Sequence, residues 1–190
     1  MNAMTAPDVW SGQDRALTVE DMENMPDDEF RYELDDGVLI VSPAPSYLHQ
    51  RVVLRLAQVL DAACPPEFEV LPGVGVNINR YQHRVPDLAV VRVDSPETVF
   101  VERPPVLAVE VASPRTRLYD RNRKKDVYEQ FGIVSYWIVD PDPGRPELTV
   151  FELRDGKYQQ AARVAGDEAF RAGRPFPVTV IPAALVRAGR

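Results

Sequence analysis

Two stretches in the middle of the chain are hydrophobic at nearly every position, not at alternate positions. They are residues 85–93 (VPDLAVVRV) and 105–113 (PVLAVEVAS). Strands with this composition are buried on both faces, which requires helices on both sides of the sheet. Two further strand-like runs lie at 69–79 and 135–140. The pattern therefore predicts a sheet whose central strands lie inside the protein.

Hydrophobic residues at helical spacing mark two segments that can cover this sheet. Ser46 can cap a helix that runs to about Ala63. Residues 116–131 predict a second helix, which ends at Gly132.

Hairpin signals lie on either side of these elements. Asp36-Gly37 and Asp155-Gly156 each separate two strand-like runs, and Asp-Gly favours a two-residue hairpin turn. The order of elements predicts an α/β (α+β) fold: a mixed β-sheet flanked by helices, with additional N-terminal and C-terminal β-hairpins.

The length and composition predict a single domain. The chain has 190 residues, of which 45% are hydrophobic, and this is enough for one sizeable core. We expect residues 17–190 to form the domain and residues 1–16, which lack periodicity, to be a flexible tail. Thr18 and Asp21 can cap a short helix after this tail. No apolar run is long enough to span a bilayer and no signal peptide is evident, so we expect a cytoplasmic protein without a membrane partner.

The supply of metal-binding side chains limits the kind of metal site. Cys64 is the single cysteine, and His49 and His83 are the only histidines. A zinc site built from Cys and His ligands is therefore improbable, and any metal should be a hard ion bound by oxygen.

The charge of the chain is unevenly distributed. Residues 1–37 hold eleven acidic and two basic residues, a net charge of -9, whereas the whole chain carries -7 and residues 38–190 therefore +2. Such a chain does not coat nucleic acid through bulk electrostatics. A local basic ridge remains an expectation if one helix carries the cluster, although a solvated helix face explains the same charges: Arg115, Arg117, Arg121, Arg123, Lys124 and Lys125.

Glu110 lies within one of the hydrophobic runs. Strand alternation places it on one face with Val106, Ala108 and Ala112. A carboxylate loses hydration there unless a cation, a metal ion or hydrogen bonds replace the water. A structural ion pair satisfies this demand as well as a metal does, so both alternatives stay open.

Asp87 occupies the entry to the neighbouring strand, directly after Pro86. A Pro-Asp pair is more often a strand boundary or turn than a metal site. Consecutive strands are usually neighbours, however, and carboxylates from two adjacent strands can converge on one divalent ion. Asp87 and Glu110 are therefore candidate metal ligands.

Lys124 falls on the hydrophobic face of the second helix. Val127, Tyr128 and Phe131 follow it at positions +3, +4 and +7, so its side chain points toward the core. Its ammonium group can instead reach solvent along the apolar surface, or pair with Asp120 one turn earlier.

In combination, these residues resemble the Uma-two group of restriction endonucleases, which belong to the PD-(D/E)XK nuclease superfamily. No single motif suffices, and the resemblance covers roughly residues 30 to 150. The matching segments are 32–37 (YELDDG), the 42–49 junction from Ser42-Pro43 to His49, Pro86-Asp87, 109–116 (VEVASPRT), Asp120, Lys124, Tyr128, Gly132 and 136–141 (YWIVDP).

The resemblance implies a restriction-endonuclease-like core in which Asp87 and Glu110 hold Mg²⁺ or Mn²⁺. The lysine that usually follows the second acid by two positions is absent, because Ala112 stands there. The D-x-x-x-K-x-x-x-Y helix of the group is matched by Asp120, Lys124 and Tyr128. The resemblance thus implies that Lys124 is a relocated catalytic lysine.

A nuclease of this kind would hydrolyse phosphodiester bonds of nucleic acid, with DNA as the expected substrate. The metal would generate hydroxide from bound water, and Lys124 would orient that water or neutralise charge on the phosphate. Arg115, Arg117 and Arg121 could hold the nucleic-acid backbone without reading its sequence. A homodimer would suit cleavage of both strands.

Two further residues are weaker candidates for the same site. Glu33 matches the family in the first hairpin and could supply a third acid, but a strand-edge carboxylate explains it equally well. His49 could line the site, although a lone histidine at a helix end is more often structural.

A non-catalytic alternative keeps the fold and changes the function. The acids and the lysine would then form a buried ion network, and the surface would bind a protein partner or nucleic acid. Residues 20–37 could mimic nucleic acid, cover the basic ridge or join a dimer interface. Other enzyme classes are disfavoured: Gly73 and Gly75 lack a dinucleotide fingerprint, Ser113 lacks a nucleophile elbow, and a glycosidase carboxylate pair leaves Lys124 without a role.

Overall fold

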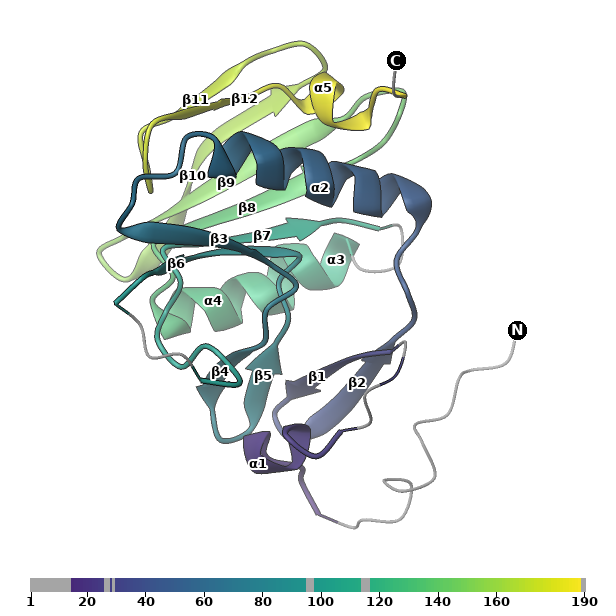
Figure 1. The fold of residues 1–190 in the computed structure, drawn as a ribbon, viewed down its shortest axis with the longest axis vertical. Helices are drawn as coiled ribbons and strands as arrows, with labels where there is room; N and C mark the ends of the chain where they lie inside the picture. Colours follow the sequence, from purple (N-terminus) through teal and green to yellow (C-terminus); the bar gives the residue numbers. More distant parts are fainter. Residues whose placement is uncertain (1–14, 26–27, 29, 95–97, 114–116, 189–190) are drawn as a thin grey trace.

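The computed structural model shows a six-stranded sheet covered on both faces, with a smaller sheet beside it (Figure 1). Most of the tail expected at residues 1–16 lies outside the described residues. The structure describes residues 15–25, 28, 30–94, 98–113 and 117–188.

The main sheet has the strand order β10-β9-β8-β7-β6-β3. Only β7 and β8 run parallel among these pairs, and the other four pairs are antiparallel, so the predicted mixed sheet is confirmed. Its strands are β3 (Phe68–Pro72), β6 (Leu88–Arg92), β7 (Leu107–Val111), β8 (Ser135–Asp140), β9 (Glu147–Arg154) and β10 (Lys157–Ala165).

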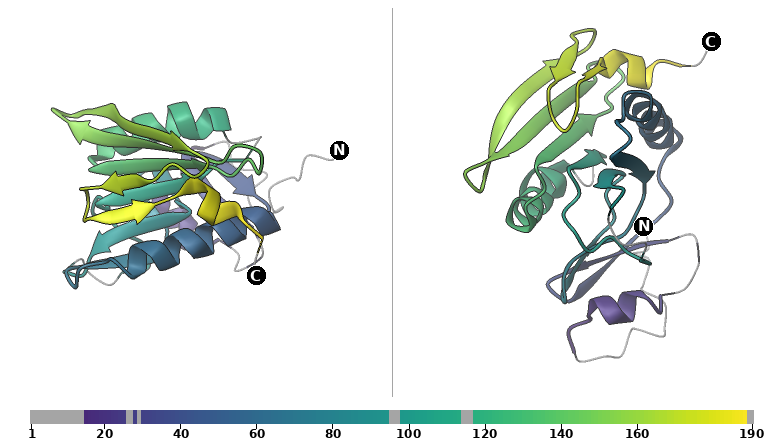
Figure 2. Two further views of the ribbon diagram at one scale, coloured as in Figure 1. Left: turned by 90° about the horizontal axis from the view of Figure 1, so that it is seen from above. Right: turned by 60° about the vertical axis from the view of Figure 1, so that its left-hand side comes forward.

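Helices lie on both faces of this sheet, as Figure 2 shows from above. One face is covered by α2 (Tyr47–Asp61) and α5 (Pro182–Val186), together with the strand pair β11 (Phe170–Ala172) and β12 (Val178–Val180). The other face is covered by one continuous helix made of α3 (Arg117–Tyr119), the π-helix η1 (Asp120–Lys124) and α4 (Lys125–Phe131).

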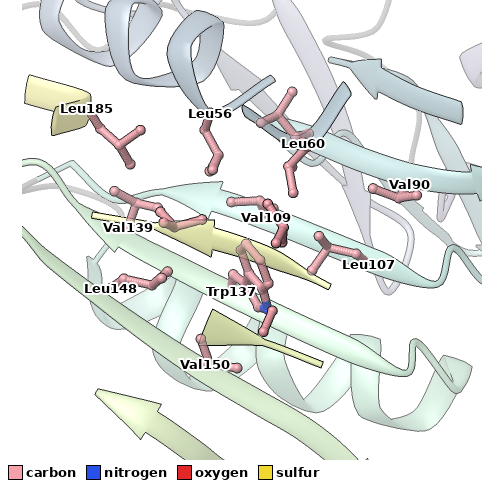
Figure 3. Close-up of a cluster of buried hydrophobic side chains, with 14 of the residues drawn as sticks. Leu56, Leu60, Val90, Leu107, Val109, Trp137, Val139, Leu148, Val150 and Leu185 are labelled. Atoms are coloured by element: carbon pink, nitrogen blue, oxygen red, sulfur yellow. The ribbon is translucent and has the colours of Figure 1, made fainter. Parts of the chain in front are cut away.

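The larger hydrophobic core lies between the sheet and α2 (Figure 3). Leu56 and Leu60 of α2 face the central strands, where Trp137 is fully buried. The α2 helix begins as predicted, because the Ser46 hydroxyl accepts a hydrogen bond from the amide of His49 at 3.3 Å. Figure 3 also shows Val90, Leu107, Val109, Val139, Leu148, Val150 and Leu185 in this core.

The opposite face of the sheet has a smaller core that is interrupted by polar side chains. Ala108 and Ala112 lie here, as alternation along β7 predicts, and they share the cluster with Tyr128 and Tyr136. Val106 was expected on this face but packs in the larger core. It precedes the first residue of β7, so strand alternation does not extend to it.

The smaller sheet has the order β2-β1-β5-β4 and lies at the lower end of the molecule in Figure 1, next to α1. The first predicted hairpin is confirmed, because β1 and β2 pair around Asp36-Gly37. The elements are α1 (Val19–Met22), β1 (Arg31–Asp35), β2 (Val38–Ser42), β4 (Val76–Asn79) and β5 (Gln82–Arg84).

The structure corrects two predicted elements. The strand expected at 69–79 is two strands, because the chain turns at Gly73 with φ of 62° and leaves the main sheet for the smaller one. The helix expected at 116–131 contains a π-helical segment. Residues 114–116, including its expected first residue, lie outside the described part of the chain.

No helix in the described residues is both long enough and apolar enough to cross a membrane.

Candidate active site

The antiparallel pairing of β6 and β7 brings the two predicted acids together. Leu88 lies opposite Val109. Because the two strands run in opposite directions, Asp87, which precedes Leu88, lies beside Glu110, which follows Val109. The amide of Val111 donates a hydrogen bond of 2.7 Å to Asp87 Oδ2. The strand pairing thus places both carboxylates at one end of the β6–β7 pair, and both are buried.

Asp87 is ionised and carries two further partners. Arg31 Nη1 donates to Oδ1 at 2.7 Å, and His49 Nε2 donates to Oδ2 at 3.0 Å. Burial opposes ionisation, but the hydrogen bond from His49 and the charge of Arg31 outweigh it and lower the pKa of Asp87 to about 2. Asp87 is therefore a buried carboxylate that needs positive neighbours.

Lys124 lies between two carboxylates, and its side chain is only 4% exposed. Its Nζ donates to Glu110 Oε1 at 2.9 Å and to Glu33 Oε1 at 3.0 Å. The Tyr128 hydroxyl donates to the same Glu110 oxygen at 2.8 Å. The predicted coreward direction of Lys124 is confirmed, and snorkelling to solvent is excluded.

Glu33 reaches this cluster from the first hairpin. It lies on β1, and its Oε1 also accepts a hydrogen bond of 3.0 Å from the amide of Val85. Glu33 is 3% exposed, so it is a buried carboxylate and not the exposed strand-edge residue of the alternative interpretation. Residues from three parts of the chain thus meet around Lys124 Nζ.

The cluster contains more acidic than basic groups. Burial raises the pKa of Glu110 to about 8, and the charges of Asp87, Asp120 and Glu33 add to this effect against the opposing charge of Lys124. Burial lowers the pKa of Lys124, but Glu110 and Glu33 outweigh it, so this pKa is raised and the lysine stays charged. The site would therefore gain from additional positive charge.

A cleft of about 730 Å³ opens onto one side of the cluster. Asp87, His49 and Arg31 line its polar part. Tyr32 and Phe100 form part of the apolar wall of the cleft. Asp87 is accordingly the acid of the cluster that a ligand in the cleft can approach.

A family model described as a putative restriction endonuclease, Uma2, matches residues 19–184. The chain belongs to the Uma2 family. This confirms the resemblance drawn from its motifs.

The fold agrees with this membership. The crystal structure of a putative nuclease of the DUF820 group from Anabaena variabilis superposes with a TM-score of 0.67. The two proteins are 17% identical, and the match covers 84% of this chain and 89% of that one. The likeness shows a shared fold. None of the curated proteins matches the chain in sequence.

The D-x-x-x-K-x-x-x-Y pattern on which the resemblance was drawn spans the π-helix and α4. Lys124 and Tyr128 both contact Glu110. Asp120 is 2% exposed, its backbone carbonyl accepts a hydrogen bond of 2.9 Å from the Tyr136 hydroxyl, and its charge acts on Glu110. All three motif residues thus lie in or beside the cluster.

The described residues of the predicted basic ridge contact other parts of the protein, and the ridge as a nucleic-acid surface stays a prediction. Arg121 pairs with Glu147 at 3.4 Å, and Lys125 lies 4.9 Å from the ring centroid of Phe151. Arg123 contacts Asp35 and Asp36 of the first hairpin, whereas Lys124 is buried. Arg115 and the side chain of Arg117 lie outside the described part of the chain.

Arg31 is the member of the site that sequence reasoning missed. It was counted only as a charge, although it stands two residues before Glu33 on β1. Residues i and i+2 of a strand share a face. The Arg-x-Glu spacing, combined with the family match at Glu33, was therefore the signal that could have found it.

The residues present fit a hard divalent ion. Asp87 and Glu110 supply carboxylate oxygens, and the excess of acidic groups favours added positive charge. Among the described residues no group of three or more Asp, Glu, His or Cys side chains forms a ready metal cage. A metal would thus depend on two carboxylates, with waters or substrate completing its shell, which is how Mg²⁺ is commonly bound.

Proposed function

We propose that the protein is a divalent-metal-dependent endonuclease of the PD-(D/E)XK type that hydrolyses phosphodiester bonds of DNA. The observation that carries this proposal is the buried contact of Lys124 with Glu110 and Glu33, placed next to Asp87 at the cleft. Membership of the Uma2 family supports the same reaction class.

Asp87 and Glu110 would hold Mg²⁺ or Mn²⁺. When bound, such an ion lowers the pKa of a coordinated water and polarises the scissile phosphate. Lys124 does not serve as a base, because its pKa is raised and it remains an ammonium ion. Its role is to stabilise the negative charge that develops on the phosphate or to orient the attacking water. Tyr128 and Glu33 hold Lys124 and Glu110 in place.

The non-catalytic alternative also has an observation in its favour. Lys124 is already paired with two carboxylates, and Asp87 with Arg31 and His49. A buried network satisfied in this way can hold a fold together without metal. In that case the protein would bind a partner through a nuclease-like fold, and Asp87 would stay paired with Arg31 and would bind no metal ion.

Mn²⁺ binding separates the two functions. Calorimetry on the wild type, Asp87→Asn and Glu110→Gln would be compared at equal folded content, with Glu152→Gln as a control outside the cluster. A metal site predicts micromolar binding in the wild type and the control, lost in both cluster variants. Duplex DNA would then be cleaved by the wild type, and Lys124→Met is expected to be at least about 100-fold slower.

Failure has a clear form in this experiment. A wild-type protein that binds no Mn²⁺, with or without duplex DNA, would leave the ion network as the function of these residues. A protein that binds Mn²⁺ and cleaves DNA equally well with and without Lys124 would contradict the catalytic role of the lysine.

We also propose a homodimer, which would suit cleavage of both DNA strands. Measurement of the molecular mass in solution would test this oligomeric state.

A further inference from the structure

Among the described residues, the Asp87 carboxylate accepts hydrogen bonds from three donors, and the donors differ in how easily they can leave. The amide of Val111 and His49 Nε2 both contact Oδ2. Arg31 Nη1 contacts Oδ1 at 2.7 Å. An ion that binds Asp87 through Oδ1 must therefore compete with Arg31.

Arg31 has the more exposed of the two side chains that donate to Asp87. The Val111 amide belongs to a central strand, and the His49 side chain is 13% exposed on the first turn of α2. The Arg31 side chain is 32% exposed, lies at the first residue of β1 and lines the cleft. It can turn from Asp87 into the cleft without breaking the sheet.

We propose that Arg31 couples metal binding to phosphodiester binding, by occupying Asp87 Oδ1 in the free protein and moving to a substrate phosphate in the cleft. This inference rests on the proposed nuclease function. The guanidinium group suits the exchange, because it forms charge-assisted hydrogen bonds with carboxylates and with phosphates in the same geometry.

The physical reason for coupling is charge compensation on both sides of the exchange. A metal that displaces Arg31 without substrate leaves the guanidinium without the carboxylate to which it is hydrogen-bonded. A phosphate that attracts Arg31 without metal leaves a buried carboxylate without its cation, which is costly. Each ligand therefore binds more favourably when the other is present, and the coupling is reciprocal.

The first measurement is Mn²⁺ binding by calorimetry in the absence of nucleic acid. Arg31→Gln should bind Mn²⁺ about tenfold more tightly than the wild type, because the competing cation is gone. Arg154→Gln is the matched control: it removes one arginine from an ion pair with Glu152 elsewhere, and its Mn²⁺ affinity should equal that of the wild type. An affinity in Arg31→Gln that is no tighter than in the control would overturn the proposal.

The second measurement separates coupling from a simple loss of charge. Binding of a fluorescein-labelled phosphorothioate duplex, which resists cleavage, would be followed by anisotropy with and without saturating Mn²⁺. The ratio of the two affinities is the coupling factor. Arg31→Gln should reduce this factor about tenfold relative to the wild type, whereas loss of charge alone would leave it unchanged. Arg31→Met repeats the test should the glutamine variant fold poorly.

The outcomes distinguish this inference from the function on which it rests. Wild-type protein that binds no Mn²⁺ in either measurement contradicts the proposed nuclease. Wild-type protein whose Mn²⁺ binding requires Asp87 and Glu110, but whose coupling factor is unchanged by Arg31→Gln and Arg31→Met, keeps the metal site and overturns the role of Arg31.

Discussion

The two hairpins with an Asp-Gly turn, β1–β2 and β9–β10, have the same turn and different roles. Asp36 and Gly37 have φ of 50° and 81°, and Asp155 and Gly156 have φ of 51° and 76°. In both hairpins an Asp-Gly pair supplies the two positive φ angles that a tight β-turn of this kind needs. The local sequence thus determines the turn in each case, and the similarity ends there.

The second hairpin extends the main sheet, whereas the first supplies the candidate site. β9 and β10 form the outer pair of the six-stranded sheet. β1 brings Arg31 and Glu33 to Asp87 and Lys124. The comparison teaches that a turn signal locates a hairpin without indicating its function, because function depends on what the strands pack against.

The turn regions of the hairpins also differ in their surroundings. Asp35 pairs with the fully buried Arg84 at 2.6 Å and with Arg123 at 2.7 Å, and it accepts a hydrogen bond of 2.9 Å from the Tyr119 hydroxyl. Within the acidic N-terminal segment, Asp35 therefore pairs with one arginine of β5 and one arginine of the π-helix. The three roles considered for residues 20–37 stay predictions.

The largest expected effect is on stability when an acid is removed from the first hairpin. Glu33→Ala should lower the free energy of unfolding by about 3–5 kcal/mol, because it breaks a buried ion pair and leaves the Val85 amide without its acceptor. Glu152→Ala in the second hairpin should cost less than about 1 kcal/mol, since its partner Arg154 is exposed. Urea unfolding measures both, and equal losses would break the comparison.

The pH dependence of stability sharpens the comparison further. The pKa of Glu110 is raised from 4.5 to about 8, so between these values the folded protein binds more protons than the unfolded chain. Its free energy of unfolding should therefore fall as pH rises through this window. Glu33→Gln removes a neighbouring negative charge and keeps the contact between Lys124 and Glu110, so the pKa of Glu110 should be lower in this variant. The decrease of the free energy of unfolding with pH should then be smaller than in the wild type.

The control for this pH experiment again comes from the second hairpin. Thermal unfolding from pH 5 to 8 would be recorded for the wild type, Glu33→Gln and Glu152→Gln. Glu152→Gln should keep the wild-type profile, and Glu110→Gln should lack this contribution to the slope. A wild-type slope that survives in Glu110→Gln would show that another group causes it.

Glycine substitution at the two turns should give an intermediate difference. A Cβ added to Gly37 would lie 2.6 Å from the Cβ of Ala16, whereas a Cβ at Gly156 would meet nothing within 4 Å. Both substitutions force an alanine to positive φ, at about 1 kcal/mol, and Gly37→Ala adds about 1–3 kcal/mol for overpacking. Denaturant midpoints compare the two, and a larger loss at Gly156 would contradict the packing difference.

The smallest difference is expected between two arginines. Arg123→Ala removes a partly exposed partner of Asp35 and Asp36 and should cost about 1 kcal/mol. Arg154→Ala removes an exposed partner of Glu152 and should cost close to zero, within about 0.3 kcal/mol. Urea unfolding measures the free energy of unfolding of both variants. A larger loss in Arg154→Ala than in Arg123→Ala would contradict the expected difference between the two hairpins.

The strands and turns could be predicted where local sequence dominates. The largely hydrophobic strands β6 and β7, the Ser46 cap and both Asp-Gly turns follow the prediction, because each depends on neighbouring residues. The break at Gly73 was missed, because the runs on either side are both strand-like and only the pairing partners separate them. The π-helix likewise has no sequence signal that we recognised.

By itself the sequence indicated that Asp87, Glu110 and Lys124 lie in or beside apolar segments, and it left open a strand-boundary position for Asp87 and a solvent-reaching ammonium group for Lys124. Only the tertiary structure decided which groups neutralise them. Glu33 and Arg31 come from a hairpin more than 50 residues before Asp87, and their distances to Lys124 and Asp87 depend on how two sheets pack. A buried charged side chain needs an opposite charge nearby, and this need follows from its neighbours in the sequence. Which residue provides that charge depends on the tertiary structure.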